Sequence, residues 1–375
     1  MKKVLLLASV VVFFASASAQ NDFPYTFTEV KNNAATETKD QCNTGTCWSF
    51  ATASFIESEL IRMGKGEHNL SEMYNVRVTY PMKAGNYVRY QGKAQFGPGS
   101  LSHDVIKAIE RYGVVPESVY DGLDPDQKRH DHSEMDAVLL GMVENLVKNS
   151  RGSLSSDWIA AVNAVLDVYL GAIPESFEYK GKKYTPASFR DELGIKAADY
   201  INITSFTHHP FYGSFILEVP DNFSQGSFYN MPIDEMVSVV EDALMAGYTV
   251  AWDADVSEKG FSFRNGMAIM PAEGVSKEQM FSEVVKEEVV TQKSRQDGFD
   301  AQQTTDDHLM HITGIAKDQD GKTYFITKNS WGDGNAFGGY QYISLEYFKA
   351  KTISVMIHKS ALNKDVKKKL DLAKQ

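Results

Sequence analysis

The stretch Gln41-Cys42-Asn43-Thr44-Gly45-Thr46-Cys47-Trp48-Ser49-Phe50 contains both cysteines of this 375-residue chain. Apolar residues recur at helical spacing after Cys47, and Gly64 ends the pattern, which predicts a helix over 47–63. The free N–H groups and the dipole at a helix N-terminus stabilise a thiolate and lower its pKa. Cys47 is therefore a candidate nucleophile, and an unreactive buried cysteine at a helix start is the alternative.

Gln41 lies on the loop side of this predicted helix, a short distance before Cys47. Its side-chain amide and the backbone N–H of Cys47 are two donors of the kind that form an oxyanion hole in acyl transfer. A disulfide between Cys42 and Cys47 is a further alternative, but the tight loop it needs would pull Cys47 out of the helix start. We expect Cys42 to be a small loop residue or a free thiol.

A thiol nucleophile needs a histidine base, and His308 is the candidate among the nine histidines. It begins a predicted strand, in which alternation places His308 and His311 on opposite faces. His308 lies at the strand mouth beside a loop and is the better placed of the two to face a cleft. A metal site on these histidines with Asp306 and Asp307 is the alternative, which the same alternation disfavours.

The segment Lys328-Asn329-Ser330-Trp331-Gly332 follows the next predicted strand. An antiparallel neighbour would set the amide of Asn329 beside the ring of His308, where it can accept the ring N–H and fix the tautomer. Trp331 would then cover that hydrogen bond. The segment alone is also typical of a turn, but Gln41, Cys47, His308 and Asn329 occur together in the order that a Cys–His–Asn peptidase requires.

Helices dominate the first part of the chain and strands the last part. Helical spacing predicts helices over 101–112, 157–170 and 233–246 and an acidic helix over 278–290. Alternation predicts strands over 248–252, 309–316, 323–328, 340–345 and 352–358. This order indicates an α+β protein with a helical lobe and a sheet-built lobe.

The start of the chain, MKKVLLLASVVVFFASASAQ, has a basic end, an apolar core and the small residues Ala17-Ser18-Ala19. This pattern is typical of a secretory signal peptide, here over 1–19, and predicts an exported protein, periplasmic or secreted. No later segment is long and apolar enough to predict a membrane helix. The formal net charge of −11 disfavours nucleic acid and anionic membranes as partners.

The motifs resemble those of the papain-like cysteine peptidases, and most closely the bleomycin hydrolase and aminopeptidase C branch. They are Gln-x5-Cys-Trp-Ser-Phe from Gln41, Asp307-His308, and Lys328-Asn329-Ser330-Trp331-Gly332. The long middle section and the segment from Pro232 to Asp253 favour this branch. The resemblance implies an α+β papain-like fold of two lobes, one helical and one an antiparallel β-barrel-like lobe, with a helical insertion.

The resemblance also implies ranges and roles. The helical lobe would cover about 41–120, the insertion 121–230, the β lobe 231–360 and a C-terminal tail 361–375 of one domain that starts at residue 20. Cys47 would be the nucleophile, His308 the base, Asn329 its orienting partner and Trp331 the shield, with Gln41 in the oxyanion hole. No cofactor or metal is implied. Partners would be peptide or protein substrates and, from the branch, the other subunits of a homohexamer.

Substrate binding is implied for Gly99, Ser100 and Asp307, where Gly99-Ser100 stands in place of the Gly-Gly pair along which the family's substrate backbone runs. In this branch a C-terminal arm lies in the cleft and binds the substrate's amino terminus. Here the tail after His358, KSALNKDVKKKLDLAKQ, is short, basic and helix-prone. Aminopeptidase activity is thus the first expectation. Endopeptidase or dipeptidyl cleavage, acyl transfer to an amine or thiol, and a catalytically silent binding protein are the alternatives.

Overall fold

The structure, a computed structural model, describes residues 23–124 and 126–372, and the predicted signal peptide over 1–19 lies outside them. The helices are α1 (Cys47–Arg62), α2 (Glu72–Arg89), α3 (Ser102–Tyr112), α4 (Ser133–Lys148), α5 (Asp157–Leu170), α6 (Pro186–Leu193), α7 (Ile233–Met245), α8 (Gln292–Asp300), α9 (Leu345–Lys351) and α10 (Lys364–Lys369). Short 3₁₀ turns are η1 (Ala197–Asp199), η2 (Gln279–Phe281) and η3 (Lys359–Ala361). None of the described helices is long and apolar enough to cross a bilayer.

The strands alternate with these helices mainly in the second half of the chain. They are β1 (Thr28–Asn32), β2 (Phe177–Tyr179), β3 (Lys182–Tyr184), β4 (Tyr200–Thr204), β5 (Ser214–Ile216), β6 (Ser227–Asn230), β7 (Val250–Ala254), β8 (Phe261–Ser262), β9 (Met267–Ala268), β10 (His308–Lys317), β11 (Thr323–Lys328), β12 (Tyr340–Ser344) and β13 (Thr352–His358). The predicted helices at 47, 101, 157 and 233 and the five predicted strands are thereby confirmed, with bounds that differ by at most two residues.

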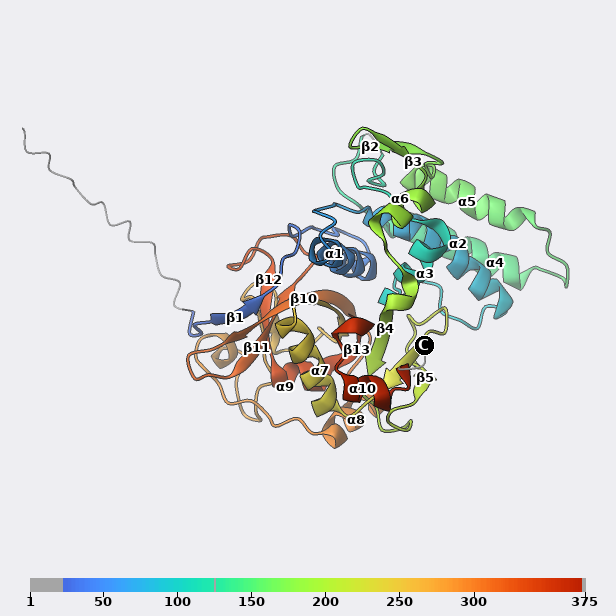
Figure 1. Ribbon diagram of the computed structural model, residues 1–375. Coiled ribbons are helices and arrows are strands. Elements are labelled where there is room, and N and C mark those ends of the chain that lie inside the picture. Colours follow the sequence, from blue (N-terminus) through green and yellow to red (C-terminus); the bar gives the residue numbers. More distant parts are fainter. Residues whose placement is uncertain (1–22, 125, 373–375) are drawn as a thin grey trace, which may run out of the picture.

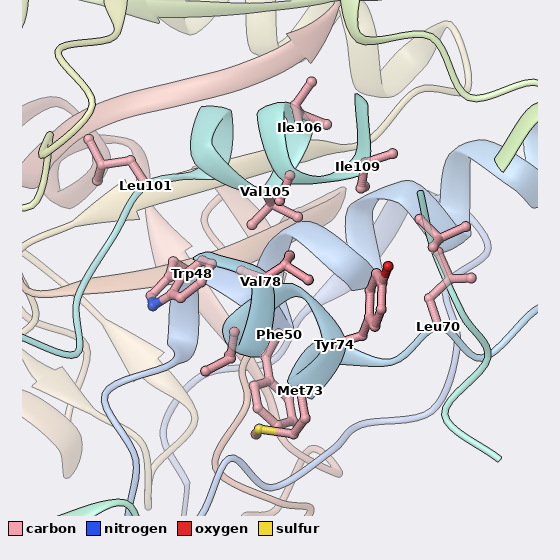
Figure 2. Packing of buried hydrophobic residues seen from close by; sticks show 14 of the residues in the cluster. Trp48, Phe50, Leu70, Met73, Tyr74, Val78, Leu101, Val105, Ile106 and Ile109 are labelled. Atoms are coloured by element: carbon pink, nitrogen blue, oxygen red, sulfur yellow. The ribbon is translucent and has the colours of Figure 1, made fainter. Parts of the chain in front are cut away.

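The helix that carries Cys47 lies between the two halves of the molecule. Figure 1 shows α1 with the sheet on one side and α2 to α6 on the other. Every residue of α1 from Cys47 to Leu60 is buried, as expected for a helix covered all round. Figure 2 shows the helical side of this packing, a cluster of α1, α2 and α3 side chains that includes Trp48, Phe50, Met73, Tyr74, Val78, Val105 and Ile109.

One mostly antiparallel sheet forms the other half. Its strand order is β5-β6-β4-β13-β7-β10-β11-β12-β9-β8, with β1 paired to β10. The pairs β4–β6 and β9–β12 are parallel. Within the described residues the end strands β5 and β8 do not pair with each other, so the expected barrel is an open sheet. The α+β class is confirmed.

The region 121–230, expected as a helical insertion, is mixed. It contains α4, α5 and α6, but its strands β4 and β6 also extend the main sheet from the edge of β13. The predicted acidic helix over 278–290 is wrong, because only η2 is helical there. The cause is tertiary: Glu287 accepts the N–H of Met270 at 2.7 Å, and Pro271 pairs with Glu287 in an antiparallel bridge.

The described part of the tail packs on the β lobe. Leu362, Val366 and Leu370 belong to the apolar cluster that also includes α7. Lys369 of α10 forms a 2.7 Å ion pair with Glu235 of α7. The tail up to Leu372 is therefore a surface cover for α7, and Figure 1 shows α10 beside this helix.

Candidate active site

Cys47 is the first residue of α1, and its side chain is 7% exposed. The first backbone bonds of the helix run from the N–H groups of Ser49 and Phe50 to the carbonyl of Thr46. The N–H of Cys47 precedes these donors, and is one of the groups that an α-helix leaves without an internal partner. The thiol accepts a hydrogen bond from the backbone N–H of Leu309 in β10. The nucleophile candidate thus lies directly beside the strand that carries His308.

The loop before α1 is pressed against the segment that leads to α3. A Cβ on Gly45 would lie 2.5 Å from Cγ of Pro98, so only glycine permits this approach. Trp48 donates its indole N–H to the carbonyl of Pro98 at 2.9 Å. Both cysteines are free, so the Cys42–Cys47 disulfide is wrong, and the prediction of a free Cys42 is confirmed.

His308 and Asn329 come from neighbouring strands. Nε2 of His308 lies 2.8 Å from Oδ1 of Asn329. The amide of Asn329 is itself fixed, because its Nδ2 donates to Oε1 of Gln341 at 2.6 Å and its Oδ1 accepts the N–H of Ser330 at 2.7 Å. Since Oδ1 only accepts, Nε2 of His308 carries the proton and Nδ1 is left as the basic nitrogen.

Trp331 lies over the imidazole, with ring centroids 4.5 Å apart and planes inclined by 30°. Phe261 and Phe263 pack edge-on against the indole, and their ring centroids lie 5.9 and 5.5 Å from that of Trp331. An apolar cover excludes water from the His308–Asn329 hydrogen bond and strengthens it. The geometry thus places Trp331 where the sequence predicts a shield.

Gln41 is held by the loop that follows Asn329. Its Oε1 accepts a hydrogen bond from Ser330 Oγ at 2.6 Å, and its Nε2 donates to the carbonyl of Thr44 at 2.8 Å. These two contacts fix the amide orientation and leave one Nε2 hydrogen for a ligand. The backbones also pair: Gln41 N–H donates to Ser330 O at 2.8 Å, and Asp40 is bridged to Trp331.

The expectation that the helix start lowers the pKa of Cys47 is wrong, because burial outweighs it and disfavours the charged form of both reacting groups. Desolvation raises the pKa of Cys47 to about 12, with further contributions from the carboxyls of Asp253, Asp221 and Asp306. Desolvation lowers the pKa of His308 to about 4, against the opposing hydrogen bond to Asn329. A neutral thiol beside a neutral imidazole is the arrangement required for general-base catalysis, in which the proton moves during the attack.

The substrate-binding residues expected from the resemblance differ in their contacts. Ser100 is 1% exposed and donates its hydroxyl to Asp104 at 2.8 Å, so it is turned into the start of α3. Asp307 accepts the N–H of Ser257 at 3.2 Å and the hydroxyl of Thr305 at 2.7 Å. In this structure Asp307 holds the turn after β7, and its contact with substrate stays a prediction.

His311 belongs to a buried polar layer behind the site. Its Nδ1 lies 2.9 Å from the hydroxyl of Ser54, which also accepts from Lys328 at 2.8 Å. The two histidines therefore serve different contacts, as the strand alternation predicts. Within the described chain, the group with metal-ligand spacing is His208, His209 and Glu218. Each imidazole there is already bonded to the Glu218 carboxylate, at 3.2 and 2.7 Å.

Sequence reasoning missed Ser330, Gln341 and the carboxyls near Cys47. Ser330 stood within a quoted motif, but its partner Gln41 is distant in sequence. Gln341 had a usable signal, because alternation along 340–345 places it on the same face as the apolar Ile343, which is buried. Its partner Asn329 could not be found in this way, since the pairing depends on how β11 and β12 meet. Asp253 and Asp306 were each visible next to predicted strands, but nothing local shows that they meet.

Comparisons with known proteins identify the family of this chain. Residues 99–375 match the Peptidase C1-like family. Aminopeptidase C of Lactobacillus helveticus is 25% identical over 381 residues, which cover 89% of this chain and 82% of that relative. Aminopeptidase C of Lactobacillus delbrueckii subsp. lactis is 24% identical over 292 residues, and the alignment spans 63% of that relative.

The fold is also that of a solved relative. The crystal structure of PepW from Lactobacillus rhamnosis superposes with a TM-score of 0.73 at 19% identity, over 92% of this chain and 85% of that one. The sequence resemblance is thus confirmed. The chain belongs to the Peptidase C1-like family, in the papain-like branch of cysteine peptidases that includes the aminopeptidases C.

Proposed function

We propose that this protein is an exported cysteine peptidase that cleaves peptide bonds through an acyl-enzyme on Cys47, with the specificity of an aminopeptidase. The observation that carries the proposal is the contact set around β10. The thiol of Cys47 meets the N–H of Leu309, while the adjacent His308 is bonded to Asn329 at 2.8 Å under Trp331. To these three residues we assign the roles of nucleophile, base and orienting group.

The first half of the reaction follows from the tautomer. Nδ1 of His308 takes the thiol proton as the sulfur attacks the substrate carbonyl, and the imidazolium is stabilised through Nε2 by Asn329. The free hydrogen of Gln41 Nε2 and the N–H of Cys47 hold the oxyanion. When the tetrahedral intermediate collapses, the C–N bond breaks and His308 gives the proton to the leaving amine.

The second half returns the enzyme to its starting state. A water molecule gives a proton to Nδ1 of His308 and attacks the thioester carbonyl, and the same donors hold the oxyanion. The C–S bond breaks, the carboxylic acid leaves and the thiol recovers its proton from the imidazolium. All proton movements use one imidazole.

The aminopeptidase specificity is supported by the relatives named aminopeptidase C. Export is supported by the pattern over 1–19 in the sequence. A homohexamer is expected from the resemblance alone, and sedimentation velocity on the mature protein would measure it.

The test is hydrolysis of two peptides that differ only in an acetyl group on the amino terminus, with wild-type protein and Cys47→Ala. We expect Cys47-dependent cleavage of the free peptide only, because an aminopeptidase recognises the free amine. Cleavage of both peptides would identify an endopeptidase. Cleavage of neither, together with a Cys47 that does not react with a thiol-directed inhibitor, would contradict the proposed enzyme.

A further inference from the structure

Three carboxyl groups lie beside the candidate nucleophile without a role in the mechanism above. Asp253 of β7 is 2% exposed and lies directly opposite Leu309 in the β7–β10 pairing. Asp253 is therefore one cross-strand step from Leu309, the residue whose N–H contacts the thiol, and its carboxyl raises the pKa of Cys47. Asp306 lies in the loop that precedes β10, two residues before His308, and Asp221 lies in the segment between β5 and β6.

Two of these carboxyls lack the donors that buried carboxylates need. Oδ1 of Asp253 and Oδ2 of Asp306 are buried without a hydrogen-bond partner in the described part of the chain. The two side chains interact with each other, which requires one of them to carry a proton. Burial raises the pKa of Asp306 to about 7 and that of Asp253 well above its usual range. Facing buried carboxyls are an arrangement that a cationic ligand would complete.

The third carboxyl occupies the path of an extended substrate. A Cβ on Gly99 would lie 1.8 Å from Oδ2 of Asp221, so the carboxyl is packed against this glycine. Gln95 holds the other oxygen of Asp221 at 2.9 Å. Gly99 is the position along which the resemblance runs the substrate backbone. A peptide lying in the site must therefore end before it passes Asp221.

The segment 217–226, which carries Asp221, is fixed from within and from α3. Asn222 donates to the carbonyls of Leu217 at 2.8 Å and Gly226 at 3.0 Å, and accepts the N–H of Gly226 at 2.6 Å. Ser224 lies 3.1 Å from Nε2 of His103, and Lys107 donates to Ser224 at 2.5 Å. Asp221 is therefore carried by a segment with many hydrogen bonds, and its side chain closes one end of the site.

The nearby lysine does not neutralise this group. Lys83 is 2% exposed and lies close enough to Asp221 to affect its charge, but its ammonium donates to the carbonyls of Gly97 and Gly99. Lys83 also interacts with Asp104 and Asp136, so its positive charge is shared and, of the three carboxyls of the cluster, it acts on Asp221. Negative charge on the cluster affects the thiol, because each of its three carboxyls raises the pKa of Cys47.

We propose that Asp221, Asp253 and Asp306 form the pocket for the amino-terminal ammonium of the substrate, so that the enzyme releases one residue at a time. This inference rests on the proposed function and names its substrate class, peptides with a free amino terminus. The ammonium of a terminal residue is separated from its own carbonyl carbon by the α-carbon alone. A pocket one cross-strand step from the thiol contact therefore fits the ammonium of the residue whose carbonyl Cys47 attacks.

A lysine or arginine side chain is the other source of a cationic nitrogen. It would enter from a peptide that continues past the scissile residue, and Asp221 blocks that continuation at Gly99. The described part of the tail packs on α7, so we assign recognition of the amino terminus to the pocket and not to a C-terminal arm.

The experiment compares three arylamide substrates on the wild-type protein: alanyl, lactyl and N-acetylalanyl. The lactyl compound has a hydroxyl where the alanyl compound has an ammonium. We expect the alanyl compound to have a kcat/KM at least about 100-fold higher than the other two, since a buried charge pair discriminates strongly against a neutral isostere. Equal kcat/KM values for the alanyl and lactyl compounds would overturn the inference. This part of the experiment needs no variant.

The variants are Asp221→Asn, Asp253→Asn and Asp306→Asn, with Asp320→Asn in the exposed turn between β10 and β11 as the matched control. We expect each of the three to lower kcat/KM for the alanyl compound by tenfold or more, and to lower it little for the lactyl compound. We also expect each to speed alkylation of Cys47 by neutral iodoacetamide, because a lost negative charge favours the thiolate. Damage to the fold would lower kcat/KM for the alanyl and lactyl compounds alike, so a loss confined to the alanyl compound distinguishes the pocket from a damaged fold.

Three outcomes separate this inference from the proposed function. Cys47-dependent cleavage whose preference for the alanyl compound is unchanged in all three variants would overturn the pocket alone. Faster cleavage of acetylated peptides with lysine or arginine before the scissile residue would also overturn it, and assign the pocket to a basic side chain. Absence of Cys47-dependent cleavage of any substrate would overturn the proposed function itself.

Discussion

The hydroxyl of Ser330 donates a 2.6 Å hydrogen bond to Oε1 of Gln41, a residue 289 positions earlier in the chain. The same loop carries Asn329, whose Oδ1 accepts the N–H of Ser330 at 2.7 Å. One serine thus lies between the group that orients His308 and the group proposed to hold the oxyanion. A displacement of this loop would affect both at once.

Ser330→Ala should lower kcat about tenfold and leave KM nearly unchanged, because it frees the Gln41 amide to rotate but removes no substrate contact. Steady-state kinetics on a free-amino peptide measures the split. Ser330→Thr keeps the hydroxyl and should restore most of the rate. A rise in KM with unchanged kcat would show that Ser330 acts on binding instead.

Asn329→Ala should slow turnover less than His308→Ala, because Asn329 orients the base and His308 is the base. Removal of a base typically costs about 10²–10⁴-fold in rate, and removal of its orienting partner less. Single-turnover acylation rates would rank the two variants. Equal losses would mean that Asn329 also contacts the reacting atoms.

Leu370→Ala should lower the free energy of unfolding by about 2–4 kcal/mol, because the side chain is 3% exposed in the cluster on α7. The ratio of activity on free and acetylated peptides should not change, since the tail is here a cover for α7. Urea denaturation and the matched peptides measure the two quantities. A changed ratio in a folded variant would mean that the tail reads the substrate's amino terminus, as the C-terminal arm of this branch does.

Acid should destabilise the fold through His308. Its pKa is lowered by burial to about 4 in the folded state, against about 6.5 in an unfolded chain. Between these values the unfolded state binds more protons, so the stabilising contribution is present above pH 6.5 and is lost as the pH falls to 4. The shift corresponds to about 3 kcal/mol at most.

The measurement is urea denaturation of wild type and His308→Gln at pH 7, 5.5 and 4. The difference between the two isolates the histidine from buried carboxyls such as Glu72, whose pKa of about 7 has the opposite effect. The wild-type stability relative to the variant should fall with pH. A difference that is constant over this range would contradict the buried, neutral imidazole.

Elements rich in apolar residues and with clear ends could be predicted from the sequence, and elements held by distant contacts could not. The strands over 309–316 and 323–328 and the helix over 47–63, which Gly64 follows, were found almost to the residue. Helix α2 was missed because it contains Pro81 and many buried polar groups, among them Arg77 and Lys83. Its stability comes from packing on α1, α3 and α5.

The same division applies to the site. Cys47, His308, Asn329 and Gln41 sit at element ends with recognisable neighbours, so chemistry and order were sufficient to single them out. The proposed acidic pocket joins Asp221 from the middle section to Asp253 of β7 and to Asp306 in the loop before β10. Its existence depends on the register of β7 against β10 and on the fold of the segment 217–226, and neither has a local signature.

The first and last parts of the chain meet at β1, which pairs with β10, and at Gln41, which pairs with Ser330. On a ribosome, the thiol is synthesised long before the strand that presents its base. A nascent chain that ends before residue 308 has a nucleophile but neither an imidazole beside it nor an anchored oxyanion hole. The active site can therefore form only when the chain is nearly complete. During synthesis the enzyme is inactive until almost all of its residues have been added.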